Sequence, residues 1–373
     1  MHPSVAALIC IVVLAACAGP TGAVPSPSGP PATAGPTAGS PGATAQSTAV
    51  PPAAPTAAAT PGPVALQEFP VKAGSRPHDV APAADGGVWY TGQGNGTLGH
   101  LDPRTGAVRE VRLGSGSSPH GVIVDRNGVA WVTDSGLNAI VSVDPHASDA
   151  VKRYPLPAGT PNVNLNTAVI DRGGVLWWTG QNGWFGRLDP DGTQTAFEAP
   201  RGRGPYGITT TPAGDVFYVS LAGSHLAQVV KPTGGATVIE PPTPGQGARR
   251  AWSDSTGMVW VSEYNAGQLA RYDPATRLWR EWKLPGNALA YSVFVDDRDI
   301  VWLTDFAASA IVRFDPVSGR FDSYPHAPGG NVRQQLGRPG EVWGALSAHD
   351  RLLLVRTKTP DTPDLRRGEV HRR

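Results

Sequence analysis

From residue 66 onward the chain repeats itself. An aromatic anchor recurs seven times, with a β-branched neighbour in six of the seven repeats, at intervals of 42, 46, 40, 43, 42 and 41 residues. The anchors are Trp89, Trp131, Trp177, Phe217, Trp260, Trp302 and Trp343. Short apolar runs between Gly, Pro and Asp turns do not fit helices. A period of about 42 residues with four short strands is typical of a propeller blade. The sequence therefore predicts an all-β, seven-bladed β-propeller over residues 66–356.

The segments after the anchors predict how each blade turns and how the ring closes. An aspartate follows five of the first six anchors at a fixed depth, as in "LDPRTG" and "FDPVSG", whereas the fourth repeat has "VKPTGG". Asp-Pro followed by Gly is turn chemistry that joins two outer strands. We expect "ALQEFPV" near residue 68 to pair beside "RLLLVR" near residue 353. Such closure leaves few exposed strand edges, which predicts a monomer.

The N-terminus carries export signals. Residues 5–16 form one apolar run that is too short to span a bilayer and that fits the h-region of a signal peptide. Cys17 directly follows a small-residue site, in an arrangement that resembles a bacterial lipobox. We therefore predict a lipoprotein-type signal peptide over residues 1–17, with lipidation at Cys17. The protein would then be extracytoplasmic and would meet the membrane only through its anchor; the alternative is a plain signal peptide and a secreted protein.

Composition indicates what the segments outside the repeats are and which partners and crosslinks are excluded. Residues 18–65 are almost entirely Ala, Pro, Thr, Ser and Gly, which predicts a disordered linker, and residues 357–373 form a polar tail. A net charge of +1 argues against a nucleic-acid partner. The only cysteines are Cys10 and Cys17, so the folded domain has no disulfide and depends on its core.

Two positions in each repeat are candidates for the central channel. In a propeller, the innermost strand and the loop that enters it line one mouth of the channel. The first position stands eleven residues before the anchor, at His78, His120, Asn166, Tyr206, Arg249, Tyr291 and Val332. The second stands three residues after it, at Gly92, Asp134, Gly180, Ser220, Glu263, Asp305 and Leu346. Six of the seven residues at the first position are polar or aromatic, a bias that a scaffold does not require but that solvent-exposed positions would also show.

The repeated phrase of Pro-His-Gly, Asp-x-x-Gly, Trp-x-Thr and Asp-Pro is similar to the streptogramin B lyase family, also called the virginiamycin B lyases. The resemblance covers residues 66 to about 356. It implies a carbon–oxygen lyase that opens a cyclic ester by Mg²⁺-assisted elimination. It also implies His120 as the general base, His78 as a substrate-facing histidine and Asp134 as a metal ligand. Ser118 departs from the family pattern, because a metal-binding glutamate is expected there.

Three function classes stay open. The first is the lyase, in which a near-neutral histidine removes an α-proton and a divalent cation holds the developing charge; this activity would imply antibiotic resistance. The second is a tethered, non-catalytic propeller that binds a glycan, peptide or protein. The third is a metal-dependent lactonase like the six-bladed gluconolactonase propellers. We expect Tyr206, Arg249 and Tyr291 to contact the ligand.

Each candidate residue also has a structural interpretation. His78 and His120 would be hydrogen-bonded residues at the blade entrances. The acidic residues of the second position, Asp134 among them, would cap turns. Arg249 and its neighbour Arg250 would either bind an acidic ligand or remain solvated.

Overall fold

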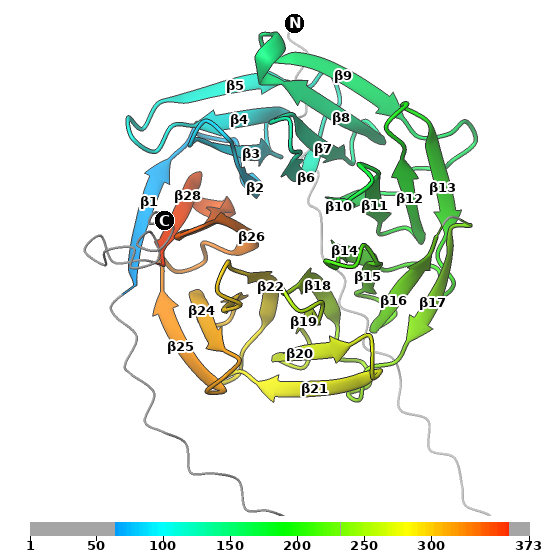
Figure 1. Ribbon diagram of the computed structural model, residues 1–373. Helices are drawn as coiled ribbons and strands as arrows, with labels where there is room; N and C mark the ends of the chain where they lie inside the picture. The colour runs from blue at the N-terminus through cyan, green and yellow to red at the C-terminus, as the bar shows by residue number, and fades with distance from the viewer. Residues whose placement is uncertain (1–63, 232, 358–373) are drawn as a thin grey trace, which may run out of the picture. The chain divides into compact units, whose positions relative to one another are not determined.

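The computed structural model describes residues 64–231 and 233–357, which form seven four-stranded antiparallel sheets arranged as a ring (Figure 1). The predicted seven-bladed propeller is confirmed. Within these ranges, helical structure is limited to two short 3-10 turns, η1 (Pro145–Ala147) and η2 (Ser347–His349). No helix in the described ranges is long and apolar enough to cross a bilayer. The predicted signal peptide, the lipidation at Cys17 and nearly all of the linker and tail lie outside the described residues.

In six blades the four strands run in chain order from the channel to the rim, and in the seventh the last three strands of the described chain are followed at the rim by its first strand (Figure 1). The innermost strands are β2 (Pro77–Pro82), β6 (Pro119–Val124), β10 (Leu165–Ile170), β14 (Pro205–Thr210), β18 (Ala248–Ser253), β22 (Ala290–Val295) and β26 (Val332–Arg338). The second strands are β3 (Val88–Gly92), β7 (Ala130–Asp134), β11 (Leu176–Gly180), β15 (Val216–Ser220), β19 (Val259–Glu263), β23 (Val301–Asp305) and β27 (Glu341–Leu346).

The two outer strands of each blade complete the sheets. The third strands are β4 (Thr97–Leu101), β8 (Ala139–Asp144), β12 (Trp184–Leu188), β16 (His225–Val230), β20 (Gln268–Asp273), β24 (Ala310–Asp315) and β28 (Arg351–Arg356). The outermost strands are β5 (Val108–Arg112), β9 (Ala150–Pro155), β13 (Gln194–Glu198), β17 (Gly235–Ile239), β21 (Leu278–Lys283), β25 (Arg320–Pro325) and β1 (Ala65–Pro70).

The seventh blade is built from both ends of the described chain. β1 pairs antiparallel with β28, which places Phe69 opposite Leu352 and Leu66 opposite Val355. Phe69 also packs on Trp343, with ring centroids 5.5 Å apart. The predicted closure is confirmed, and it covers the β28 edge that would otherwise remain unpaired.

Four anchor tryptophans, Trp131, Trp177, Trp260 and Trp302, show why most blades repeat the same phrase. Six of the seven anchors are fully buried, and Trp131 is half-buried. The Trp177 indole N–H donates to Asp171, six residues earlier, at 3.0 Å. The same carboxylate accepts N–H groups of the turn between the two strands. The Asp-x-x-Gly turn and the anchor therefore form one unit, because a buried indole N–H needs an acceptor.

A β-bulge near the start of every innermost strand positions the channel side chains. All seven innermost strands shift register against their second strand, as between Pro77 and Val80 on β2. A bulge reorients a side chain that strict alternation would send to the other face. Consecutive residues, such as His78 with Asp79, therefore meet the same cluster in the channel.

Candidate functional site in the central channel

The predicted ring of residues eleven positions before the anchors converges inside the channel. The rings of His78 and His120, from neighbouring blades, have centroids 3.9 Å apart. Asn166 Nδ2 lies 3.1 Å from His120 Nε2, and the Tyr206 ring lies 6.3 Å from that of His120. The structure thus brings these predicted residues together, and both histidines are almost completely buried, with exposures of 2% and 6%.

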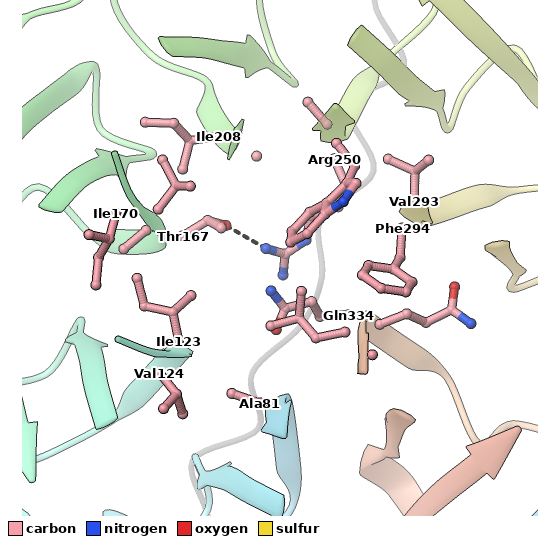
Figure 2. Close-up of a pocket in the computed structure, with 18 of the residues that line it drawn as sticks. Ala81, Ile123, Val124, Thr167, Ile170, Ile208, Arg250, Val293, Phe294 and Gln334 are labelled. Atoms are coloured by element: carbon pink, nitrogen blue, oxygen red, sulfur yellow. Dashed lines mark hydrogen bonds between the residues drawn. The ribbon is translucent and has the colours of Figure 1, made fainter. Parts of the chain in front are cut away.

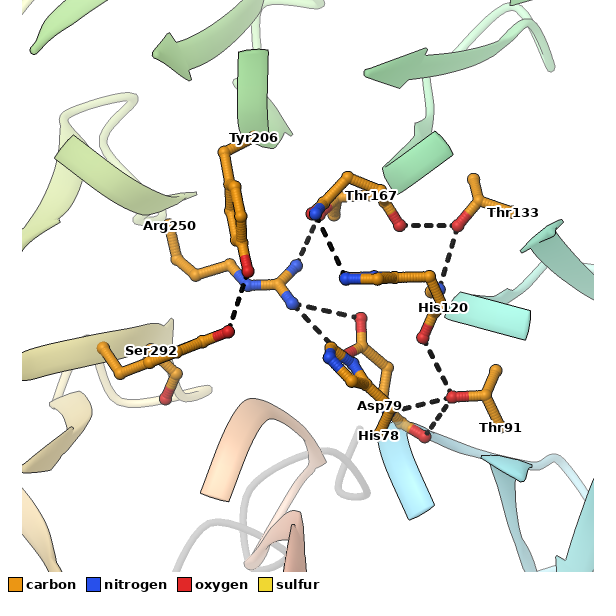
Figure 3. Close-up of polar contacts among 12 residues, drawn as sticks. His78, Asp79, Thr91, His120, Thr133, Thr167, Tyr206, Arg250 and Ser292 are labelled. Atoms are coloured by element: carbon orange, nitrogen blue, oxygen red, sulfur yellow. Dashed lines mark hydrogen bonds and ion pairs between the residues drawn. The ribbon is translucent and has the colours of Figure 1, made fainter. Parts of the chain in front are cut away.

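An ion pair that the sequence did not predict crosses this cluster (Figure 3). Asp79, directly after the first Pro-His pair, has Oδ1 2.7 Å from His78 Nδ1 and 3.2 Å from Arg250 Nη2. Asp79 and Arg250 are both buried. Burial raises the pKa of Asp79, and the charge of Arg250 opposes that rise. The sequence contained one signal for Asp79, a carboxylate directly after a Pro-His pair at the start of a channel strand.

The electrostatics of the cluster keep both imidazoles neutral at neutral pH. Burial, followed by the charges of Arg333, Arg250 and Arg249, holds the pKa of His78 well below its ordinary value. Burial and the neighbouring His78 do the same to the pKa of His120. A neutral imidazole has one donor nitrogen and one acceptor nitrogen, so the network decides which is which.

That network assigns the proton of His120. Arg250 can only donate, so Thr167 Oγ1 accepts from Arg250 and gives its own proton to Asn166 Oδ1, 2.7 Å away. Asn166 must then donate to His120 through Nδ2. His120 Nε2 is therefore the acceptor, and its proton lies on Nδ1, which has no partner in the described structure. By contrast, Asp79 holds the His78 proton on Nδ1 and leaves His78 Nε2 as an acceptor nitrogen.

Three tyrosines hold Arg249 at this end of the channel. Its guanidinium carbon lies 3.7 Å from the ring centroid of Tyr291, 4.8 Å from that of Tyr264 and 4.9 Å from that of Tyr206. The Tyr206 and Tyr291 hydroxyls are 2.7 Å apart. A cation–π contact at a partly buried site contributes about 1 kcal/mol. The predicted ligand residues Tyr206, Arg249 and Tyr291 therefore form one packed unit.

A hydroxyl two residues after the anchor ties the site of one blade to the next. Thr91 accepts from the Asp79 N–H and donates to the His120 carbonyl, both at 2.9 Å. Equivalent bonds are made by Thr133, Thr179 and Ser262. These hydroxyls pair backbone groups that the bulges leave outside the strand ladder. Sequence reasoning missed this role, although Trp-x-Thr recurs at a fixed place in the repeat.

Comparison with known protein families shows to which family the chain belongs. Residues 115–328 match the model of the virginiamycin B lyase family, which is more than half of the chain. The chain belongs to this family. A comparison with the sequences of curated proteins gave no match.

Solved structures of virginiamycin B lyases share the fold. A streptogramin B lyase is 22% identical, with a TM-score of 0.72 over 79% of this chain and 97% of that one. A catalytically inactive virginiamycin B lyase from Staphylococcus aureus, solved with quinupristin, is 20% identical, with a TM-score of 0.73 over 79% and 99%. YCF48 bound to D1 peptide is 16% identical, with a TM-score of 0.64 over 79% and 97%. At these identities the likeness establishes the propeller and not an activity.

The acidic residue that the family resemblance assigned to a metal caps a loop in this structure. Asp134 Oδ1 accepts the N–H groups of Ser118, Gly136 and Leu137 at 2.9 to 3.0 Å. The repeat-equivalent Asp305 accepts three N–H groups in the same way. The turn-capping interpretation of these carboxylates is therefore confirmed, and metal binding by Asp134 stays a prediction.

The channel itself is poorly suited to the magnesium ion that the family resemblance implies. Among the described residues, one group has metal-ligand geometry: His78, Asp79 and His120, with ligand atoms within 4.8 Å of one another. Two imidazole nitrogens and one carboxylate are a transition-metal set, whereas Mg²⁺ requires oxygen ligands. Asp79 is already paired with Arg250. These residues therefore do not fit Mg²⁺.

Proposed function

We propose that this chain is a non-catalytic, ligand-binding propeller whose channel takes up the carboxylate of an acidic peptide. The observation that carries the proposal is an excess of positive charge at the His78 end of the channel. Arg249, Arg250 and Arg333 all lie close enough to lower the pKa of His78, and Asp79 neutralises only one of them.

Two of these arginines have donor capacity to spare. Arg249 and Arg333 are only partly buried, and the Nε of each is buried without a hydrogen-bond partner in the described structure. The guanidinium fork matches a carboxylate in a bidentate way. The three tyrosines hold Arg249 in place, so little side-chain entropy is lost when a ligand binds. YCF48, a neighbour in fold, is described as bound to a peptide, which supports this use of the architecture.

A titration with fluorescent tetraglutamate tests this function, with tetraglutamine as the uncharged control. We expect binding of tetraglutamate only, weakening as salt rises. Arg249→Gln and Arg333→Gln should each weaken it by tenfold or more. Arg104→Gln, an exposed arginine in the turn between β4 and β5, is the matched control and should leave it unchanged. Equal binding of both peptides, or none, would reject the proposal.

The second candidate is the streptogramin-type lyase, and the Asp79–His78 dyad favours it. A carboxylate that orients a neutral imidazole is the arrangement of a general base. His78 Nε2 would remove the threonine α-proton of a cyclic ester, and the ester carboxylate would leave as the Cα–Cβ double bond forms. The burial of both histidines and the poor fit for magnesium place this candidate second.

Mass spectrometry separates the two functions. The protein is incubated with quinupristin, with and without magnesium. Elimination would give a linear product of unchanged mass, abolished by His78→Gln, and would establish the lyase. The substitution His120→Gln tests which histidine is the base. An intact antibiotic together with tetraglutamate binding supports the binding propeller.

We also propose that the propeller is held outside the cytoplasm by a lipid on Cys17. The support is the apolar run that ends directly before this cysteine. Labelled palmitate should be incorporated into the wild-type chain and not into Cys17→Ser. Incorporation into both would contradict the anchor.

A further inference from the structure

A cavity of about 280 Å³ lies at the other end of the channel, where the innermost strands end. All seven innermost strands contribute to its wall (Figure 2). His78, Asp79 and His120 do not line it. This cavity is therefore separate from the acidic-peptide site proposed above.

Most of the wall is hydrocarbon. The apolar lining includes Ile123, Val124, Ile170, Trp252, Phe294 and Leu336. Ring centroids of Trp252 and Phe294 lie 5.1 Å apart, so these two side chains form one aromatic corner. A concave, mostly apolar site with a few polar groups is the usual form of a small-molecule pocket.

The polar groups of the wall have unused hydrogen-bonding capacity. Arg250 enters the cavity from β18 and Gln334 from β26, and their exposures are 3% and 7% (Figure 2). Arg250 Nε and Gln334 Oε1 have no hydrogen-bond partner in the described structure. Buried polar atoms are normally paired, so two orphan atoms in one cavity indicate a missing partner. A Gln amide that turns about its last bond presents N–H in place of oxygen.

The net charge of the channel determines whether the missing partner is an anion or a cation. Asp79 compensates Arg250, but Arg249 and Arg333 lie near the same cluster with positive charge. An anion entering the cavity therefore meets a net positive field, and a buried cation would be repelled.

We propose that this cavity binds a small amphipathic carboxylate, a branched or aromatic acid whose head contacts Arg250 and Gln334. Its hydrocarbon body lies against the apolar wall. Since a water molecule occupies about 30 Å³ in the liquid, the cavity has room for about nine non-hydrogen atoms of that size. Acids of the size of 4-methylpentanoate or benzoate, with about eight and about nine non-hydrogen atoms, fit this limit. The proposal does not rest on the acidic-peptide function, because its polar contacts are Arg250 and Gln334, whereas the peptide site uses the free donors of Arg249 and Arg333.

Calorimetric titration with these two acids tests the site. We expect both acids to bind, with acetate and 4-methylpentanamide at least tenfold weaker, because the first lacks the hydrocarbon and the second lacks the charge. Equal affinity for the acid and its amide, or no binding of either acid at millimolar concentration, would overturn the proposal.

Two variants locate the ligand without breaking the Asp79–Arg250 pair. Val124→Trp fills the cavity from a half-buried position and should abolish binding, whereas Val151→Trp, at an exposed position on β9, should not. Gln334→Leu should weaken acid binding by about tenfold and leave amide binding unchanged. Circular dichroism checks that each variant is folded. Unchanged acid binding in a folded Val124→Trp protein would place the ligand elsewhere. Arg249→Gln should lose tetraglutamate binding but weaken acid binding by less than Gln334→Leu does, because Arg249 does not line the cavity and contributes only to its field, so the two proposals fail separately.

Discussion

Arg250 and Asp79 stand 171 residues apart in the chain, yet Arg250 Nη2 lies 3.2 Å from Asp79 Oδ1 inside the channel. They belong to β18 and β2, which lie in blades that are not neighbours in the ring (Figure 1). The pair thus connects opposite parts of the propeller through its centre. When one partner of a buried pair is removed, the other charge remains buried without compensation.

Asp79→Asn should therefore destabilise the protein by about 3–5 kcal/mol. The double variant Asp79→Asn with Arg250→Met removes both charges and should recover most of that loss. Urea denaturation of the two single variants and the double variant measures this. A double variant that is no more stable than either single one would show that the pair is not the cause.

Thr91→Val should cost about 1–3 kcal/mol, because it leaves the Asp79 N–H and the His120 carbonyl without their bonds. The substitution keeps the side-chain volume, so no cavity contributes to the loss. Thr237→Val, at an exposed position on β17, is the control and should stay within about 0.5 kcal/mol. Equal midpoints of the two variants in urea would contradict the proposed locking role.

Phe69→Ala should cost about 3–5 kcal/mol, since it removes a buried ring that packs on Trp343 at the closure. Because β1 covers the edge of β28, the variant should also expose that edge and associate more readily. Thermal melting and light scattering measure the two effects. Val317→Ala, at a position that is 98% exposed, should change neither. A monomeric variant with wild-type stability would show that closure does not depend on this contact.

Glu263 predicts a pH dependence of stability. Burial raises its pKa to about 8, from 4.5 in an exposed chain. The folded state therefore favours the protonated acid. The contribution of Glu263 to the free energy of unfolding is fully present below pH 4.5 and is lost as pH rises towards 8. The slope is at most about 1.4 kcal/mol per pH unit. Glu263→Gln should make the melting temperature less dependent on pH over this range. Glu198→Gln, at an exposed position, should show the same pH dependence as the wild type. Parallel curves for all three proteins would contradict the assignment.

The candidate site was only partly predictable. The first channel ring was found because each blade repeats the same phrase, so one spacing located His78, His120 and Tyr206 at once. The metal-ligand role of Asp134 was transferred from a resemblance and stays a prediction, whereas its loop-capping bonds are seen in the structure. The proton positions on the two histidines could not be predicted, since they depend on Arg250 and Thr167 from other blades.

By itself, the sequence determined the number of blades, their short strands between Gly, Pro and Asp turns, and the closure between β1 and β28. These features depend on local spacing and on strand pairing, which the pattern of residues states directly. Only the tertiary structure decided that Asp79 pairs with Arg250, that the histidines are buried and neutral, and that a cavity lies beyond them. The angle of each blade around the ring and the bulge in each innermost strand set which distant side chains meet, and strict alternation along a strand predicts neither.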